Sequence, residues 1–227
     1  MKRIIIIDGG PRKNMNTAKL LQSFAEGAKS AGGDIEVKTV RLYDIDYRGC
    51  MSCMACKLKG KAANICRFKD ALAPVLEEIA QADGLVLGSP IYFGEVTGQM
   101  RAFLERLAFP WLSYNDYSLT APKRMPVVLV ETMNGTPERN NSNHFGTMEW
   151  CITLPLANPN ASSDTTLAKW RNTAITNWAV SPKRQSTPGA MPTGRRTCKR
   201  LSRLEREWQN RKRYLIERFL ISKVTSI

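Results

Sequence analysis

The sequence predicts an α/β fold, with a doubly wound parallel sheet covered by helices in three α/β/α layers. Two observations lead to this prediction. Continuous apolar runs, of the kind found in parallel strands that are buried on both faces, recur through the first 150 residues. Segments with helical spacing of apolar residues separate these runs, and strands that alternate with helices in this way form parallel sheets.

The first three elements are expected near the N-terminus. Residues 2–8 carry four consecutive isoleucines and predict the first strand. Asn16 or Thr17 can cap a helix that runs to about residue 30, where two glycines follow. Residues 35–42 contain β-branched side chains and predict the second strand.

The next four elements continue the alternation. We expect a helix over residues 70–82, a third strand over 84–88, a helix over 97–108 and a fourth strand over 126–131. Ligands of such sheets bind at the carboxyl ends of the strands. The loops after the first, third and fourth strands are therefore the candidates for a binding site.

The composition suits one globular domain, because 43% of the 227 residues are hydrophobic. No stretch approaches the roughly eighteen apolar residues of a membrane span, and the N-terminus is typical of a strand rather than a signal peptide. We therefore expect a cytoplasmic protein without a membrane span. In that compartment cysteines serve metal or redox chemistry more often than disulfides.

The net charge of +14 is concentrated in the C-terminal third. Residues 1–150 hold 19 Lys and Arg against 16 Asp and Glu, whereas residues 151–227 hold 15 against 4. We predict a domain over residues 1–156 and an atypical basic tail over 157–227, whose polar, proline-punctuated composition favours disorder. Within the tail, residues 200–221 are a basic helix candidate. It could be an arm for RNA or an acidic membrane, a helix docked on its own domain, or the product of a shifted reading frame.

Four cysteines within seventeen residues are the most unusual motif. Cys50, Cys53 and Cys56 form a C-x2-C-x2-C run, and Cys66 follows after nine more residues. A tight run of this kind is typical of cubane [4Fe-4S] ligands, whereas zinc sites more often pair two separated C-x2-C turns. The spacing therefore favours a [4Fe-4S] site with Cys66 as the fourth ligand. A zinc site and a metal-free group of thiols remain alternatives.

The loop after the first strand has the features of a phosphate site. It begins with Gly10, continues through the cations Arg12 and Lys13, and ends at Thr17 on a helix N-terminus. Backbone amides, the helix dipole, a hydroxyl and a cation together favour a bound phosphate. An ordinary capped turn is the alternative.

The loop after the third strand suits a flat ligand. Ser89 and two glycines let backbone amides approach closely, and Tyr92 and Phe93 offer flat faces for stacking, although both aromatics could instead be core residues. Residues 132–135, after the fourth strand, offer amide and side-chain groups for a third side of the pocket. Such a mixture of groups is typical of a flavin site.

Three stretches together resemble a known family. IIIIDGGPRKNMNTAKLL, the C-x2-C-x2-C run and ADGLVLGSPIYFGEVTGQMRAFLERL are similar to the flavodoxin-like NAD(P)H-dependent FMN reductases, within them to the iron–sulfur flavoprotein branch. The resemblance covers about residues 1–150. It implies a flavodoxin-like domain whose first loop binds the FMN phosphate and whose third-strand loop lines the flavin ring. Gly10 stands where the family usually has a serine. The candidate cofactor-binding residues are Gly10, Pro11, Arg12, Asn14, Asn16, Thr17, Ser89, Pro90, Ile91, Tyr92, Phe93, Gly94, Asn134 and Gly135.

The resemblance implies an oxidoreductase that uses FMN, takes a hydride from NAD(P)H and passes electrons to a small acceptor or a redox protein, with a [4Fe-4S] cluster as a further carrier. It also implies a homodimer. We expect no acid or base catalyst, and give the lone His144 no catalytic role. A flavodoxin-like electron carrier and a zinc-stabilised nucleic-acid-binding module remain alternatives. The nearly neutral charge of residues 1–150 argues against nucleic acid as a partner and against the strongly acidic carriers.

Overall fold

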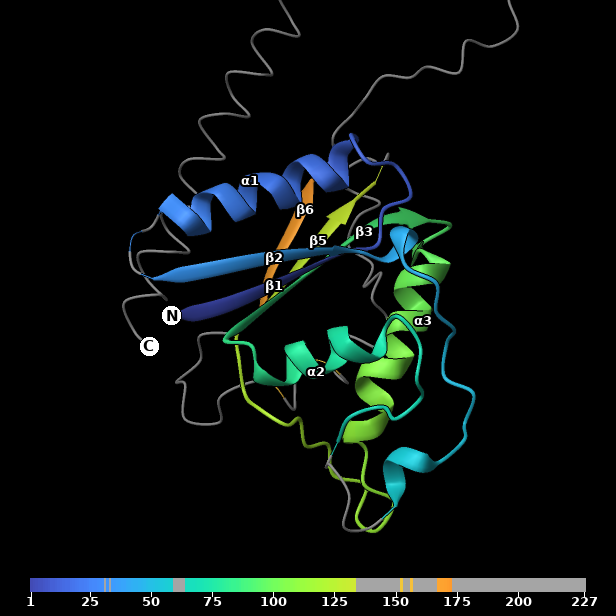
Figure 1. Ribbon diagram of the computed structural model, residues 1–227. Coiled ribbons are helices and arrows are strands. Elements are labelled where there is room, and N and C mark those ends of the chain that lie inside the picture. Colours follow the sequence, from blue (N-terminus) through green and yellow to red (C-terminus); the bar gives the residue numbers. More distant parts are fainter. Residues whose placement is uncertain are drawn as a thin grey trace, which may run out of the picture.

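The computed structural model describes residues 1–30, 32, 34–58, 64–133, 152 and 156, and the backbone of residues 167–172. A twisted parallel sheet forms the centre of the molecule (Figure 1). Its strand order is β2-β1-β3-β5-β6. These strands are β1 (Lys2–Asp8), β2 (Ile35–Arg41), β3 (Gly84–Tyr92), β5 (Val127–Thr132) and β6 (Leu167–Asn172).

Helices cover both faces of the sheet. Helix α1 (Asn16–Ser30) lies on one face, and α2 (Ala73–Gln81) and α3 (Gly98–Ala108) lie on the other (Figure 1). Alternation along the strands feeds two cores: Ile6 packs with Leu20 and Leu21 of α1, whereas its neighbours on β1 join the larger core under α2 and α3. The predicted three-layer α/β/α fold is therefore confirmed.

One close contact fixes α1 on the sheet. Gly88 lies at the centre of β3, and a Cβ atom placed on it would lie 2.6 Å from Leu21 Cδ1. The leucine side chain is almost fully buried and occupies that space. The glycine thus lets α1 approach the middle of β3 closely.

Most predicted elements agree with the structure to within one residue at each end, and two of them differ by three or four residues at one end. Strand β3 continues to Tyr92, so residues 89–92, which we expected as a loop, extend the sheet and pair through a short antiparallel strand, β4 (Glu95–Val96). Helix α2 begins at Ala73 rather than at residue 70. The carboxylate of Asp70 instead accepts the backbone N–H of Leu72 and so forms a separate turn before the helix begins.

The composition beyond residue 156 favoured disorder, but Leu167–Asn172 is a strand in the structure. This segment forms β6 and pairs in parallel with the whole of β5. The sequence of this segment, LAKWRN, has three polar residues among six, so its apolar pattern does not predict a strand. The remaining residues of 157–227 lie outside the described part of the chain, so the predicted basic tail and its boundary stay predictions.

Among the described helices, none is both long enough and apolar enough to cross a bilayer. The predicted cytoplasmic location stays a prediction.

Candidate functional site

A hollow lies at the carboxyl edge of the sheet, where the loops after β1, β3 and β5 meet. Its lining combines the first predicted loop with the end of β3 and the end of β5. The residues around it are Gly10, Pro11, Arg12, Met15, Asn16, Thr17, Pro90, Ile91, Tyr92, Thr132 and Met133. Eight of these were predicted as cofactor-binding residues. Met15 was missed because an apolar side chain carries no phosphate-binding signal.

Two threonines close the floor of this hollow. Thr17, in the first turn of α1, lies 2.7 Å from Thr132 between their Oγ1 atoms, and both side chains are buried. A hydroxyl can donate one hydrogen bond while it accepts another. Thr17 can therefore hold Thr132 and still present a polar group to an anion at the N-terminus of α1.

Asp8 explains why residue 10 is glycine. Its Oδ1 accepts the Gly10 N–H at 2.8 Å, and its Oδ2 accepts Arg41 Nη1 at 2.7 Å. A Cβ atom on Gly10 would lie 2.9 Å from that Oδ1, so any other residue at position 10 requires the Asp8 carboxylate to shift. Burial raises the pKa of Asp8, while the Gly10 N–H and the Arg41 charge oppose the shift.

A second set of bonds braces the loop after β3. Thr97 caps α3 by accepting the N–H of Met100, and its hydroxyl donates to the carbonyl of Gly9 at 2.8 Å. Ser89 is fully buried; its hydroxyl donates to the carbonyl of Pro90 and accepts the N–H of Thr97. Ser89 thus holds the loop through these two hydrogen bonds. It is not among the residues that line the hollow, where we had placed it.

Several other predicted residues lie away from the lining. Phe93 and Gly94 form the tip of the β3–β4 turn, both with positive φ, and the phenyl ring is fully exposed. Asn14 is on the exposed loop before α1. Asn134 and Gly135 lie outside the described residues.

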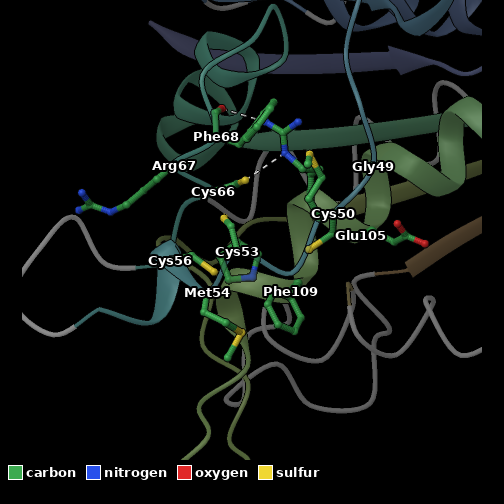
Figure 2. A pocket seen from close by; sticks show the side chains of 13 residues that line it. Gly49, Cys50, Cys53, Met54, Cys56, Cys66, Arg67, Phe68, Glu105 and Phe109 are labelled. Carbon is green, nitrogen blue, oxygen red and sulfur yellow. Dashed lines mark hydrogen bonds between the residues drawn. The ribbon is translucent and has the colours of Figure 1, made fainter.

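The four cysteines line a second hollow, and all four are free thiols (Figure 2). Cys50 and Cys53 lie on the connection that leads to the short helix η2 (Ala55–Lys57), Cys56 lies within η2, and Cys66 lies on the segment before α2. The backbone of Ser52 and Met54, between the cysteines, is left-handed, which curls the run into a loop. The C-terminal half of α3 and η3 (Phe109–Trp111) form the opposite wall.

Lys57 fastens this loop to the end of α3. Its Nζ donates to the carbonyls of Phe109 and Leu112, and lies 4.5 Å from the centre of the Phe109 ring. Burial lowers the pKa of Lys57, and the neighbouring thiols of Cys56 and Cys50 oppose the shift. Burial raises the pKa of Cys56, and Lys57 opposes it. The lysine supplies positive charge beside the sulfur atoms.

The four cysteines offer thiolate ligands, which iron–sulfur clusters take. Within the described ranges, no three His, Cys, Asp or Glu side chains lie close enough together to hold a single metal ion. Cationic side chains beside the hollow, including Lys57 and Arg106, suit the negative charge of a thiolate-bound cluster.

The two hollows share no lining residue. The structure separates them along α3, whose N-terminal cap at Thr97 contacts the first loop and whose C-terminal half faces the cysteines.

Comparison with known proteins decides the family. Residues 2–142 match the family described as NADPH-dependent FMN reductase. This chain belongs to that family. The match covers more than half of the chain, including the three loops of the hollow and the cysteine segment, and it confirms the family resemblance of the sequence.

Individual relatives point to the same branch. The chain is 35% identical over 136 residues to an iron-sulfur flavoprotein of Archaeoglobus fulgidus (60% of this chain, 63% of the relative). It is 34% identical over 104 residues to an iron-sulfur flavoprotein of Methanocaldococcus jannaschii (46% of this chain, 51% of the relative). The chain thus spans about half to two thirds of the length of these curated relatives.

Solved structures support the fold. One similar structure is an NAD(P)H:quinone oxidoreductase from Methanothermobacter marburgensis, with a TM-score of 0.55, 13% identity, and coverage of 78% of this chain and 87% of the other. Another is an FMN-dependent NADH-azoreductase from Bacillus anthracis in complex with FMN, with a TM-score of 0.55, 13% identity, and coverage of 77% and 89%. At this identity the likeness concerns the fold alone.

Proposed function

We propose that this protein is an FMN-dependent oxidoreductase that takes a hydride from NAD(P)H and passes electrons to a small acceptor or a redox protein. The observation that carries the proposal is the hollow at the carboxyl edge of the sheet, where the predicted phosphate loop and the predicted ring loop meet. The membership of the chain in the FMN reductase family supports FMN as the ligand. FMN, when bound, supplies the hydride and electron chemistry, which side chains do not provide.

The residues of the first hollow divide the binding between them. Arg12, Thr17 and the N-terminus of α1 would hold the phosphate, because they offer a cation, a hydroxyl and a positive dipole end. Pro90 and Tyr92 would lie against the ring, since both line the same hollow from the end of β3. The floor formed by Thr17 and Thr132 keeps these two sides at a fixed separation.

We also propose that Cys50, Cys53, Cys56 and Cys66 hold a [4Fe-4S] cluster, which supplies one-electron transfer when bound. Their shared hollow, their thiol ligands and the nearby cations support this. The names of the curated relatives favour it as well, since those relatives are iron-sulfur flavoproteins. We expect a homodimer, on the family resemblance.

Protein purified without oxygen tests both proposals. We expect the absorption bands of oxidised flavin on a broad sulfur-to-iron background, about one FMN per chain, and steady NAD(P)H oxidation once a quinone or an azo dye is added. A flavin-loaded protein that oxidises no NAD(P)H without a separate reductase would instead be an electron carrier. A colourless protein that contains zinc would support the nucleic-acid-binding alternative.

A further inference from the structure

Arg106, on α3, is buried, and all five N–H donors of its guanidinium are used. Nε donates to Cys66 Sγ at 3.0 Å. Nη1 donates to the carbonyl of Arg48 at 2.9 Å and to Asp70 Oδ2 at 2.7 Å. Nη2 donates to the carbonyl of Phe68 at 3.1 Å and to Asp70 Oδ1 at 3.0 Å. The carboxylate thus holds the guanidinium as a fork, and the sulfur takes the remaining edge.

These bonds join the two chain segments that carry the cysteines. The carbonyl of Arg48 lies two residues before Cys50, and Asp70 lies four residues after Cys66. The gaps within the C-x2-C-x2-C run are short enough for the loop itself to position its thiols. Nine residues separate Cys66 from the run, so its position relative to Cys50 depends on tertiary contacts, and Arg106 makes a contact to both sides.

The choice of sulfur as an acceptor is informative. A neutral thiol is a weak hydrogen-bond acceptor, whereas an anionic thiolate is a strong one. A buried guanidinium that gives one of its donors to Cys66 Sγ suits a sulfur that carries negative charge, as a cluster ligand does. Hydrogen bonds to ligand sulfurs are also among the features that set the reduction potential of a cluster.

We propose that Arg106 is a positioning residue for the iron–sulfur site: it holds Cys66 in place as the fourth ligand and raises the reduction potential of the cluster through its bond to that sulfur. This inference rests on the cluster in the proposed function. Asp70 serves it indirectly, by fixing the guanidinium.

The test compares Arg106→Lys with the wild type after anaerobic reconstitution with ferrous iron and sulfide. Lysine keeps a positive charge and an aliphatic stem but loses the fork and the directed Nε–H. We expect the iron content to fall from about four to about three per chain, with the paramagnetic signature of a three-iron cluster in the oxidised protein. Cys66→Ala supplies the reference for that signature. Chains that keep the fourth iron should show a lower reduction potential in a redox titration.

Two controls separate positioning from general damage. Arg101→Lys changes an exposed arginine on the same helix, whose ion pair is with Glu105, and should leave iron content and potential unchanged. FMN content reports whether each variant is folded, since the flavin hollow shares no residue with the cysteine hollow. If Arg106→Lys binds no FMN, Asp70→Asn replaces it, because it loosens the fork and leaves the arginine in place.

The outcomes are distinct. Wild-type iron content and potential in Arg106→Lys would overturn the positioning role and leave the proposed function standing. A wild-type protein that binds FMN and oxidises NAD(P)H but takes up no cluster would remove the cluster and the role of Arg106 together, and leave the flavin chemistry. Loss of FMN in both Arg106→Lys and Asp70→Asn would also overturn the proposal, because the pair would then support the fold as a whole.

Discussion

Replacement of Thr17 by valine separates two roles that the structure gives to one hydroxyl. Thr17 Oγ1 bonds Thr132 Oγ1 in the buried floor of the first hollow and also stands at the N-terminus of α1, where we place the FMN phosphate. Thr17→Val removes both interactions at nearly constant volume. Thr132→Val removes the bond between the two threonines and leaves the hydroxyl of Thr17 available to the phosphate.

The magnitudes of the two losses differ. A hydrogen bond to a charged group contributes about 1.5–3 kcal/mol, so we expect Thr17→Val to weaken FMN binding about 10- to 150-fold. A neutral hydrogen bond contributes about 0.5–1.5 kcal/mol, so Thr132→Val should weaken FMN binding by at most about tenfold. Either change leaves one buried hydroxyl without its partner, which costs about 1–3 kcal/mol of folding free energy in the FMN-free protein.

Flavin fluorescence titration of FMN-free protein gives the dissociation constants, and urea denaturation of the same samples gives the free energies of unfolding. Thr17→Ser, which keeps the hydroxyl, should bind FMN within a few-fold of the wild type. Equal weakening by Thr17→Val and Thr132→Val would refute the assignment of Thr17 to the phosphate, and would mean that both threonines act only through the floor of the hollow.

Three further predictions concern packing, the cysteine loop and pH. Gly88→Ala should lower the free energy of unfolding by about 1–3 kcal/mol, measured by urea denaturation, because its Cβ would overlap Leu21 on α1. Lys57→Met should speed hydrogen exchange of the backbone amides of residues 53–57 by up to about tenfold, because two carbonyl contacts and a cation–π contact are lost. Burial opposes ionisation of Asp70, but hydrogen bonds from Arg106 and its charge outweigh this and lower the pKa of the carboxyl. The stability that this ion pair contributes should therefore be complete above about pH 4, the ordinary pKa of Asp, and be lost as the pH falls further, in urea denaturation between pH 7 and 3.

Each of these has a matched comparison. Leu21→Ala in the Gly88→Ala background should recover part of the loss, and strictly additive effects would contradict the overlap. Lys69→Met removes an exposed lysine from the same connection. If this variant speeds hydrogen exchange of residues 53–57 as much as Lys57→Met does, the specific role of Lys57 is contradicted. In Asp70→Asn the free energy of unfolding should fall less between about pH 4 and pH 3 than in the wild type. An unchanged fall would mean that other carboxylates cause the loss of stability in acid.

Local patterns were enough to predict most of the fold. The isoleucine run of β1, the helical spacing of α1 and the buried run at the start of β3 each depend on a periodicity that the sequence displays directly. Strand β6 escaped prediction because its place in the sheet is set by its pairing with β5, and the polar residues within it hide the pattern. The extension of β3 to Tyr92 was missed for a related reason, since glycine and proline in that stretch are typical of turns.

The site was predictable to a different degree. Motif spacing pointed to both loops of the first hollow and to the four cysteines, because each motif lies within a short stretch of chain. Spacing gave no indication that Arg106 bonds Cys66 or that Thr132 bonds Thr17. The residues of the first pair lie 40 positions apart in the chain, and those of the second pair lie 115 positions apart. It also gave no indication that the hydroxyl of Ser89 accepts the N–H of Thr97. The direction of a side chain depends on its tertiary surroundings, which a motif does not contain.

Helix α3 sets the geometry between the two candidate sites. Its N-terminal cap, Thr97, is bonded to the carbonyl of Gly9 in the phosphate loop, and Arg106 is bonded to Cys66. Nine residues of helix place these two anchors roughly 13 Å apart along the axis, at about 1.5 Å per residue. Bonds at both ends of the helix favour a constant separation between the proposed FMN site and the proposed cluster site. The occupancy of the FMN site and the occupancy of the cluster site should then be independent of each other. One ligand changes the affinity for another by favouring one of two conformations, and a helix held in a single position has no second conformation to favour.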